Sequence, residues 1–389
     1  MNTIKNSRHV WASLSALTCL LTPFAVRAAD WVQAKSEHFT VYSQMGPSTT
    51  ETYLRNLEQY RFVLNSFYGS KDIETLPPLR VYLLNNRPSL TTIRPDLPAG
   101  AAGVFVFDTE GTSAMAVFPD RLVSTGSDAQ HQPESASQII LFHEYAHDFM
   151  YKHDLERYPP WFVEGFAEYY GTTRLHDNQV AVGLYWSDRA RTLNGVGSIR
   201  YDKLLRSATS WQGNSSDTEA YYAQSWLLTH WIFAAPERMA QFRAYLKAYR
   251  QGDDPVSAFE TSFGLPMKKL TIELNDYFHK MPAKIYALKD MPVPVIKTTA
   301  LPASLNKLIL LDAGIRSGLP SEQVQKTLGN IRREAAKFPD DNEALLILAR
   351  AEVIGGDPQK AIAWLTPYTE AHPADAEAAF RLGEAYYRL

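Results

Sequence analysis

Short apolar runs and one long amphipathic segment alternate along the N-terminal part of the chain. Four runs have the apolar or alternating pattern of strands, at residues 38–42, 79–84, 104–107 and 114–118. Over residues 50–68, apolar positions recur every three or four residues, which predicts an amphipathic helix that Gly69 ends. This order of strands and helix predicts an α/β region before residue 138.

The pattern becomes mainly helical from residue 138 to about residue 286. Just before this region, residues 121–137 are polar and rich in Ser, Gln and Asp, which predicts a surface loop, with a lid over a site as the alternative. Residues 291–306 contain Pro292, Pro294 and Pro302, which predicts a semi-rigid linker. The chain is therefore expected to divide at this linker.

An internal repeat follows the linker. The apolar and turn residues of a helix–turn–helix repeat stand at Leu348, Ala349, Ala361, Leu365 and Pro373. The next copy begins with Leu382, which is 34 residues after Leu348. Residues 342–389 resemble the tetratricopeptide repeat, and residues 308–341 resemble a degenerate copy. The resemblance implies a helical domain over residues 307–389 that recruits a protein partner.

The first residues have the pattern of an export signal. Lys5 and Arg8 precede a mostly apolar stretch, residues 11–26, and Ala28 ends a small-residue cleavage site. We therefore expect residues 1–28 to be a signal peptide and the protein to be exported, either to the periplasm or as a secreted protein. An uncleaved anchor is the alternative, although the apolar stretch is short for a membrane span.

Composition excludes further classes of function. The formal net charge is −3, with 39 Lys and Arg against 42 Asp and Glu, and no basic tract stands out, so nucleic acid is not an expected partner. The single cysteine, Cys19, lies in the expected signal peptide. A mature chain would therefore have no thiol for disulfides, zinc ligands or nucleophilic catalysis.

Residues 139–150 predict an apolar helix that carries a metal-binding pattern. His143 and His147 are four residues apart, so both imidazoles project from one face, where they would bind Zn²⁺ at roughly 2.0–2.1 Å. Glu144 stands beside this pair and is placed to take a proton from a water molecule that the metal acidifies. Burial of these groups without a partner would be costly, which favours one Zn²⁺ per chain over the alternative, a hydrogen-bonded core cluster.

A second apolar helix is expected over residues 161–170, with Glu164 and Glu168 on one face. The HExxH pattern followed by W-x-x-E-G-x-A-E-Y resembles the gluzincin metallopeptidases, and within them the bacterial peptidase-MA-like domains. The resemblance implies a thermolysin-like catalytic domain in which Glu164 is the third zinc ligand. It implies that Glu168 is an outer carboxylate that orients His143. A plain surface charge at Glu168, or an exchange of roles between the two glutamates, stays open.

Tyr222 is the candidate donor to a developing oxyanion. Residues 222–225 are similar to the Y-x-K-G segment of aminopeptidase-N-type enzymes, whose tyrosine hydroxyl stabilises the tetrahedral intermediate. Gln224 and Ser225 replace the Lys and Gly, so a tyrosine that only packs is an equal alternative, and Tyr221 is a reserve. Other histidines are expected as core or surface residues rather than ligands, namely His131, His153, His176 and His230.

One departure from the family pattern bears on specificity. Aminopeptidases of this group carry a G-x-M-E-N strand whose glutamate binds the free amine of the substrate, and the comparable residues here, 113–117, contain no acid. Endopeptidase action is therefore favoured over aminopeptidase action. The same strand stays a candidate for pairing with an extended peptide by β-augmentation.

The sequence thus predicts an α+β catalytic domain, a small mixed sheet plus a helical subdomain, followed by α-helical repeats. The expected parts are a signal peptide at 1–28, an N-terminal α/β part at 29–137, a helical zinc-binding part at 138–290, a linker at 291–306 and repeats at 307–389. The expected function is hydrolysis of a peptide or protein substrate, with Glu144 as general base. The alternatives are an exported scaffold with a structural or inactive zinc site, and zinc-dependent hydrolysis of a non-peptide bond.

Overall fold

The computed structural model describes most of the chain. The described residues are 31–69, 77–98, 101–108, 111–118, 122–123, 134–153, 158–176, 178–195, 197–208 and 215–389. The expected signal peptide lies outside them, and so do residues 124–133 of the expected loop. Across the described ranges, we find no helix that combines the length and apolarity needed to cross a bilayer.

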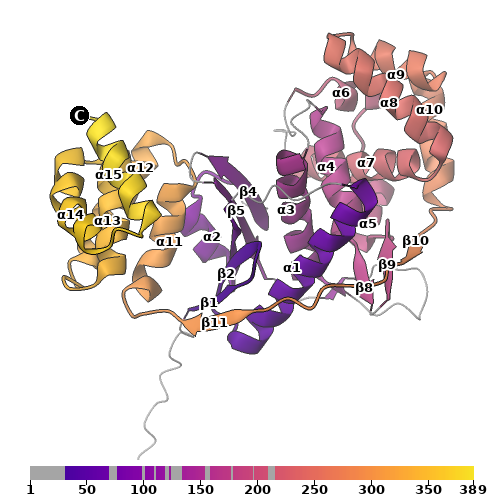
Figure 1. The fold of residues 1–389 in the computed structure, drawn as a ribbon. Helices are drawn as coiled ribbons and strands as arrows, with labels where there is room; N and C mark the ends of the chain where they lie inside the picture. Colours follow the sequence, from indigo (N-terminus) through magenta and orange to yellow (C-terminus); the bar gives the residue numbers. More distant parts are fainter. Residues whose placement is uncertain are drawn as a thin grey trace, which may run out of the picture.

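A mixed sheet forms the centre of the N-terminal part (Figure 1). Over the described residues it has six strands in the order β11-β1-β2-β3-β5-β4. The strands are β1 Val32–Lys35, β2 Phe39–Ser43, β3 Leu79–Leu84, β4 Gly103–Asp108, β5 Gly111–Val117 and β11 Lys297–Ala300. β3 is parallel to β2 and β5, whereas the other neighbours are antiparallel. The four strands predicted from the apolar pattern are confirmed.

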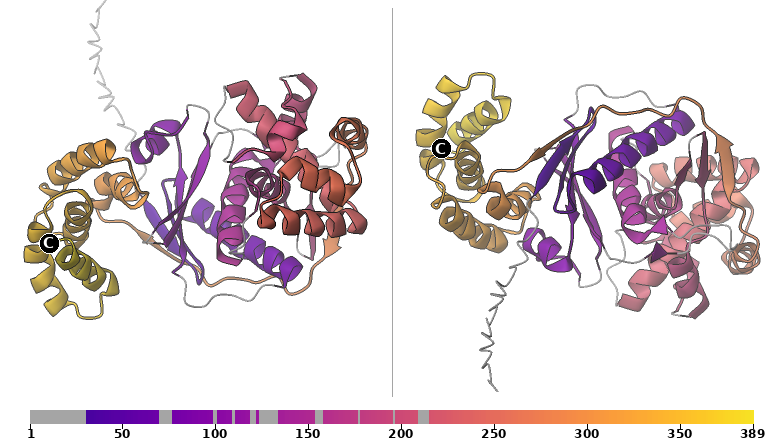
Figure 2. Two further views of the ribbon diagram at one scale, coloured as in Figure 1. Left: turned by 90° about the horizontal axis from the view of Figure 1, so that it is seen from above. Right: turned by 90° about the horizontal axis from the view of Figure 1, so that it is seen from below.

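Helices cover both faces of this sheet (Figures 1 and 2). They are α1 Pro47–Tyr68 and α3 Ala136–His153 on one face, and α2 Arg87–Ile93 and α11 Leu305–Arg316 on the other. Successive side chains of a strand point to opposite faces. In β3, Val81 accordingly packs with α1 and α3, whereas Tyr82 packs with α2 and α11. The predicted helix over residues 50–68 is α1, and Gly69 ends it with φ 59°.

Over its described residues, the part of the chain from 160 to 278 is mainly helical, as predicted. Its helices are α4 Pro160–Gly171, α5 Ser187–Gly195, α6 Tyr201–Leu205, α7 Ser215–Phe233, α8 Pro236–Gln251, α9 Pro255–Phe263 and α10 Met267–Phe278. A small antiparallel sheet was not predicted, and it consists of β8 Arg174–His176, β9 Gln179–Val182 and β10 Lys284–Ala287. Strands of three or four residues are too short to give a periodic signal.

The segment predicted to be a linker contributes to the fold. Within residues 291–306, β11 pairs with β1 and so becomes the edge of the main sheet. Met291 and Ile296, which precede this strand, pack against the main hydrophobic core. β11 has the sequence Lys-Thr-Thr-Ala and is largely exposed, so it carries no apolar alternation that would mark it as a strand.

Helices fill the predicted repeat region. They are α11, α12 Ser321–Ala335, α13 Asn342–Gly355, α14 Pro358–Ala371 and α15 Ala376–Tyr387, and each packs on the next. Asp341, Asp357 and Asp375 cap the starts of α13, α14 and α15 by accepting a backbone N–H. With the two sheets and the preceding helices, this arrangement confirms an α+β fold followed by a helical segment.

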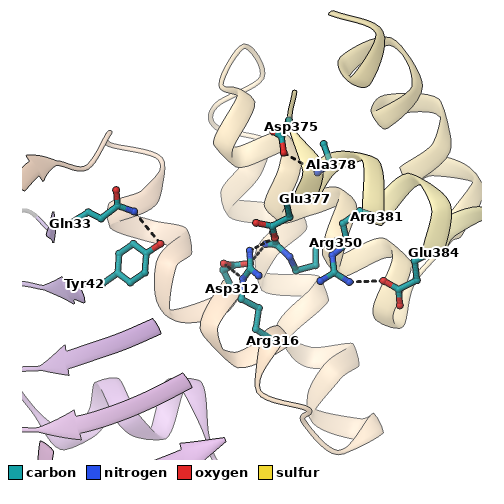
Figure 3. A network of polar contacts seen from close by, with 10 residues as sticks. All are labelled: Gln33, Tyr42, Asp312, Arg316, Arg350, Asp375, Glu377, Ala378, Arg381 and Glu384. Atoms are coloured by element: carbon teal, nitrogen blue, oxygen red, sulfur yellow. Dashed lines mark hydrogen bonds and ion pairs between the residues drawn. The ribbon is translucent and has the colours of Figure 1, made fainter. Parts of the chain in front are cut away.

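An ion-pair network joins every second helix of this region (Figure 3). Arg316 of α11 binds Asp312 at 2.9 Å, and it also binds Glu377 of α15. Arg350 of α13 stands 34 residues after Arg316 and binds the same two carboxylates. Because α11 also packs on the main sheet through Ile309 and Ala313, the C-terminal helices are held against this sheet.

Candidate metal and catalytic site

α3 carries the two histidines of the HExxH pattern and is fixed by its apolar face. Phe142 stacks on Tyr60 of α1 with 4.0 Å between ring centroids. His143 and His147 lie one turn apart on a partly exposed part of α3, and their Nε2 atoms are 3.1 Å apart. A helix held in the core therefore presents both imidazoles toward one point.

α4 brings Glu164 to this point. Glu164 Oε2 lies 3.5 Å from Nε2 of His143 and 3.5 Å from Nε2 of His147. Ligand atoms that bind Zn²⁺ at roughly 2.0–2.1 Å in a tetrahedral arrangement are about 3.3 Å apart. The three side chains are thus spaced as metal ligands, and within the described residues they are the one group of this kind.

The electrostatics of Glu164 also suit a cation. Burial alone would raise its pKa, but the adjacent imidazoles of His147 and His143 outweigh burial and hold the pKa of Glu164 well below its usual range. Among the described residues, Oε2 is buried and accepts no hydrogen bond. A buried, ionised oxygen of this kind is costly unless a donor or a metal meets it.

Glu144 lies beside the three ligands but is not one of them. Its side chain is buried, and burial raises the pKa of Glu144 to about 8. Oε1 occupies space next to β4, because a Cβ on Gly103 would come within 2.4 Å of it. Glycine at position 103 therefore makes room for this carboxylate, a role that the sequence pattern did not reveal.

Glu168 lies behind His143, as the resemblance implies. Its Oε1 is 3.6 Å from Nδ1 of His143, and its side chain is fully buried. The alternative prediction, a plain surface charge at Glu168, is therefore wrong. Arg189 of α5 donates to both carboxylate oxygens, at 2.8 and 2.6 Å. Arg189 has no motif around it in the sequence, so its contact with Glu168 was not predicted.

Tyr222 of α7 faces the same group. Its ring centroid lies 6.4 Å from that of His143, and the side chain is partly exposed. The carboxylate of Glu164, together with burial, holds the pKa of Tyr222 well above its usual range, so the hydroxyl keeps its proton as a donor. Tyr221, the reserve candidate, is fully buried in the core.

His230 is not part of the candidate metal site. His230 is buried, with Nδ1 2.6 Å from the Tyr277 hydroxyl and Nε2 2.9 Å from the Gly183 carbonyl, so it is a core histidine as predicted. Burial lowers the pKa of His230 to about 4. His131 lies outside the described residues.

The strand proposed for β-augmentation is the wrong one. Residues 113–117 belong to β5, which pairs with β3 on one side and β4 on the other, so its backbone is already occupied. β4 ends the sheet in the described part of the chain and lies against α3. Its outer edge therefore has no strand partner among the described residues.

Gly165→Ala is expected to destabilise the protein by about 3 kcal/mol, because α4 and α7 touch at this glycine. A Cβ there would lie 2.4 Å from the Ser225 carbonyl oxygen and 2.1 Å from Thr229 Oγ1. Thermal unfolding would measure the loss. Gly329→Ala in α12 is the matched control, since nothing lies within 4 Å of its added methyl group. Equal melting temperatures for the two variants would contradict this packing argument.

We compared the sequence with known proteins. No family model matches it, and no curated protein is significantly similar to it.

Proposed function

We propose that this chain is an exported zinc metallopeptidase of the gluzincin type that hydrolyses peptide bonds. The observation that carries the proposal is the meeting of His143, His147 and Glu164, with the carboxylate of Glu144 beside them. Two imidazoles and one carboxylate leave a fourth position open, which is the donor set of catalytic zinc rather than of closed structural sites.

The chemistry divides between the metal and the chain. Bound Zn²⁺ would act as a Lewis acid that acidifies a water molecule and polarises a carbonyl. Glu144, whose pKa a neighbouring dication would bring down from the value of about 8 that burial gives it, would accept the proton of that water and deliver it to the leaving amine. The protonated hydroxyl of Tyr222 would donate to the oxyanion that develops on the substrate. Glu168 and Arg189 would keep the ring of His143 in its orientation.

The free edge of β4 favours cleavage at an internal peptide bond of the substrate, away from its ends. An extended substrate would pair with the outer edge of β4 and continue past the site in both directions. The neighbouring strand β5 contains no acid that would hold a free amino terminus. Endopeptidase action is therefore proposed over aminopeptidase action. The C-terminal helical repeats would bind a protein partner.

Zinc removal tests the proposal. The zinc-loaded protein is expected to contain one Zn²⁺ per chain and to cleave a casein-type substrate, and chelation should abolish cleavage until zinc is restored. Metal analysis and product mass spectrometry give the two readouts. A zinc-loaded protein that cleaves no peptide would instead support the alternative, an exported scaffold whose metal site is structural or inactive.

A further inference from the structure

An aromatic strip leads away from the candidate metal site along the free sheet edge. Phe105 and Phe107 stand two residues apart on β4, so their side chains point to the same face of the strand. Tyr151 of α3 meets both of them. Its ring centroid is 6.3 Å from Phe105 and 4.5 Å from Phe107, and the Phe107 pair is stacked.

The strip is continuous with the metal-binding group. The ring centroid of Phe105 lies 6.3 Å from that of His147. Tyr151 follows His147 by four residues on α3, and therefore lies one turn further along the same side of the helix. The three rings thus form a path that begins at a metal ligand and continues between β4 and α3.

The far end of this path is open to solvent. Phe107 is 57% exposed and Tyr151 is 43% exposed, although the two rings stack on each other. An exposed pair of large aromatic side chains next to a candidate catalytic site is a typical binding surface for an apolar group. Offset and edge-to-face packing against such rings favours another aromatic ring over an aliphatic chain.

We propose that Phe105, Phe107 and Tyr151 form a specificity site for an aromatic side chain of the substrate. Two residues along a strand advance about 6.6 Å, so a peptide paired with β4 would place a residue two or three positions from the scissile bond on Phe107 and Tyr151. This inference rests on the proposed peptidase function, because the peptide must lie along β4 to reach both places. The free edge of β4 supplies the backbone contacts, and the rings select the side chain.

Cleavage of a peptide library tests this inference. The zinc-loaded wild type is expected to favour Phe, Tyr or Trp over Ala about tenfold or more at one position, two or three residues from the cleaved bond. Phe107→Ala combined with Tyr151→Ala should abolish this preference, so that the ratio of the cleavage rates of aromatic and Ala peptides falls to about one. Both side chains are exposed at the surface, so the double variant should fold, which circular dichroism would verify.

Two further variants sharpen the result. Phe107→Tyr keeps an aromatic ring and should keep the preference. Tyr386→Ala removes an aromatic side chain that is 56% exposed on α15, and it should leave the preference unchanged. If the wild type cleaves peptides without an aromatic preference, or if the double variant keeps that preference, the specificity site is refuted while the peptidase proposal stands. If the zinc-loaded wild type cleaves no peptide in the library, both proposals fail.

Discussion

Glu144→Gln is expected to keep one Zn²⁺ per chain and to lose about 10²- to 10⁴-fold in kcat for peptide hydrolysis. Glutamine has nearly the shape of glutamate, so the space beside Gly103 stays filled. It accepts no proton from water, however, and none of the metal ligands is altered. Metal analysis and steady-state kinetics on one peptide substrate would separate the two effects.

Glu58→Gln is the matched control for this substitution. Glu58 is also a buried carboxylate, and it also contacts a histidine, with Oε2 2.8 Å from Nδ1 of His38. It joins α1 to His38, in the turn between β1 and β2, so its loss should affect stability but leave kcat within about twofold of the wild type. Loss of zinc from Glu144→Gln, or equal activity in all three proteins, would contradict a role for Glu144 as general base.

Periodicity predicted the elements that bury a continuous apolar face. β2, β3, β5 and α1 each place buried apolar side chains in the core, β4 packs the partly buried Phe105 against it, and all five stand where the sequence placed them. The elements that were missed are short or exposed; β1 and α2, which do bury apolar residues, are four and seven residues long. β11 is an exposed edge strand held by backbone pairing to β1, and β8 to β10 are three or four residues long. Pairing with a distant strand leaves no local signal in the sequence.

The site shows a similar division between local and distant contacts. His143 and His147 stand four residues apart on one helix, so their spacing alone brings both imidazoles to one point, with Glu144 next to His143 in the chain. Glu164 was predicted as the third ligand from the resemblance of the next helix to a known motif. Arg189 and the aromatic strip were not predicted, because the packing of helices and strands, rather than spacing along the chain, brings them to the site. The position of β4 at the edge of the sheet was not predicted for the same reason, since the sequence of a single strand does not determine the order of strands in a sheet.

Substitutions of the two glutamates of α4 are expected to have different effects, one mainly on metal binding and the other mainly on stability. In Glu164→Ala, the affinity for Zn²⁺ should fall by more than the roughly 10- to 100-fold that an outer partner costs. The metal-free protein should lose less stability than in Glu168→Ala, because Glu164 gives up only its 3.5 Å contacts with the two imidazoles and its Oε2 accepts no hydrogen bond from the described residues. Competition with a chelator and thermal unfolding of the metal-free protein measure the two quantities.

Glu168→Ala should give the opposite balance. Zinc affinity should fall only about 10- to 100-fold, since Glu168 acts through His143. The metal-free protein should be destabilised by about 3 to 5 kcal/mol, because the guanidinium of Arg189 loses both of its bonds to this carboxylate in a largely buried place. Glu168→Gln keeps an acceptor for Arg189 and should lie between the wild type and Glu168→Ala. If Glu168→Ala loses zinc more completely than Glu164→Ala, the two carboxylates exchange roles, and the ligand set proposed for this site is wrong.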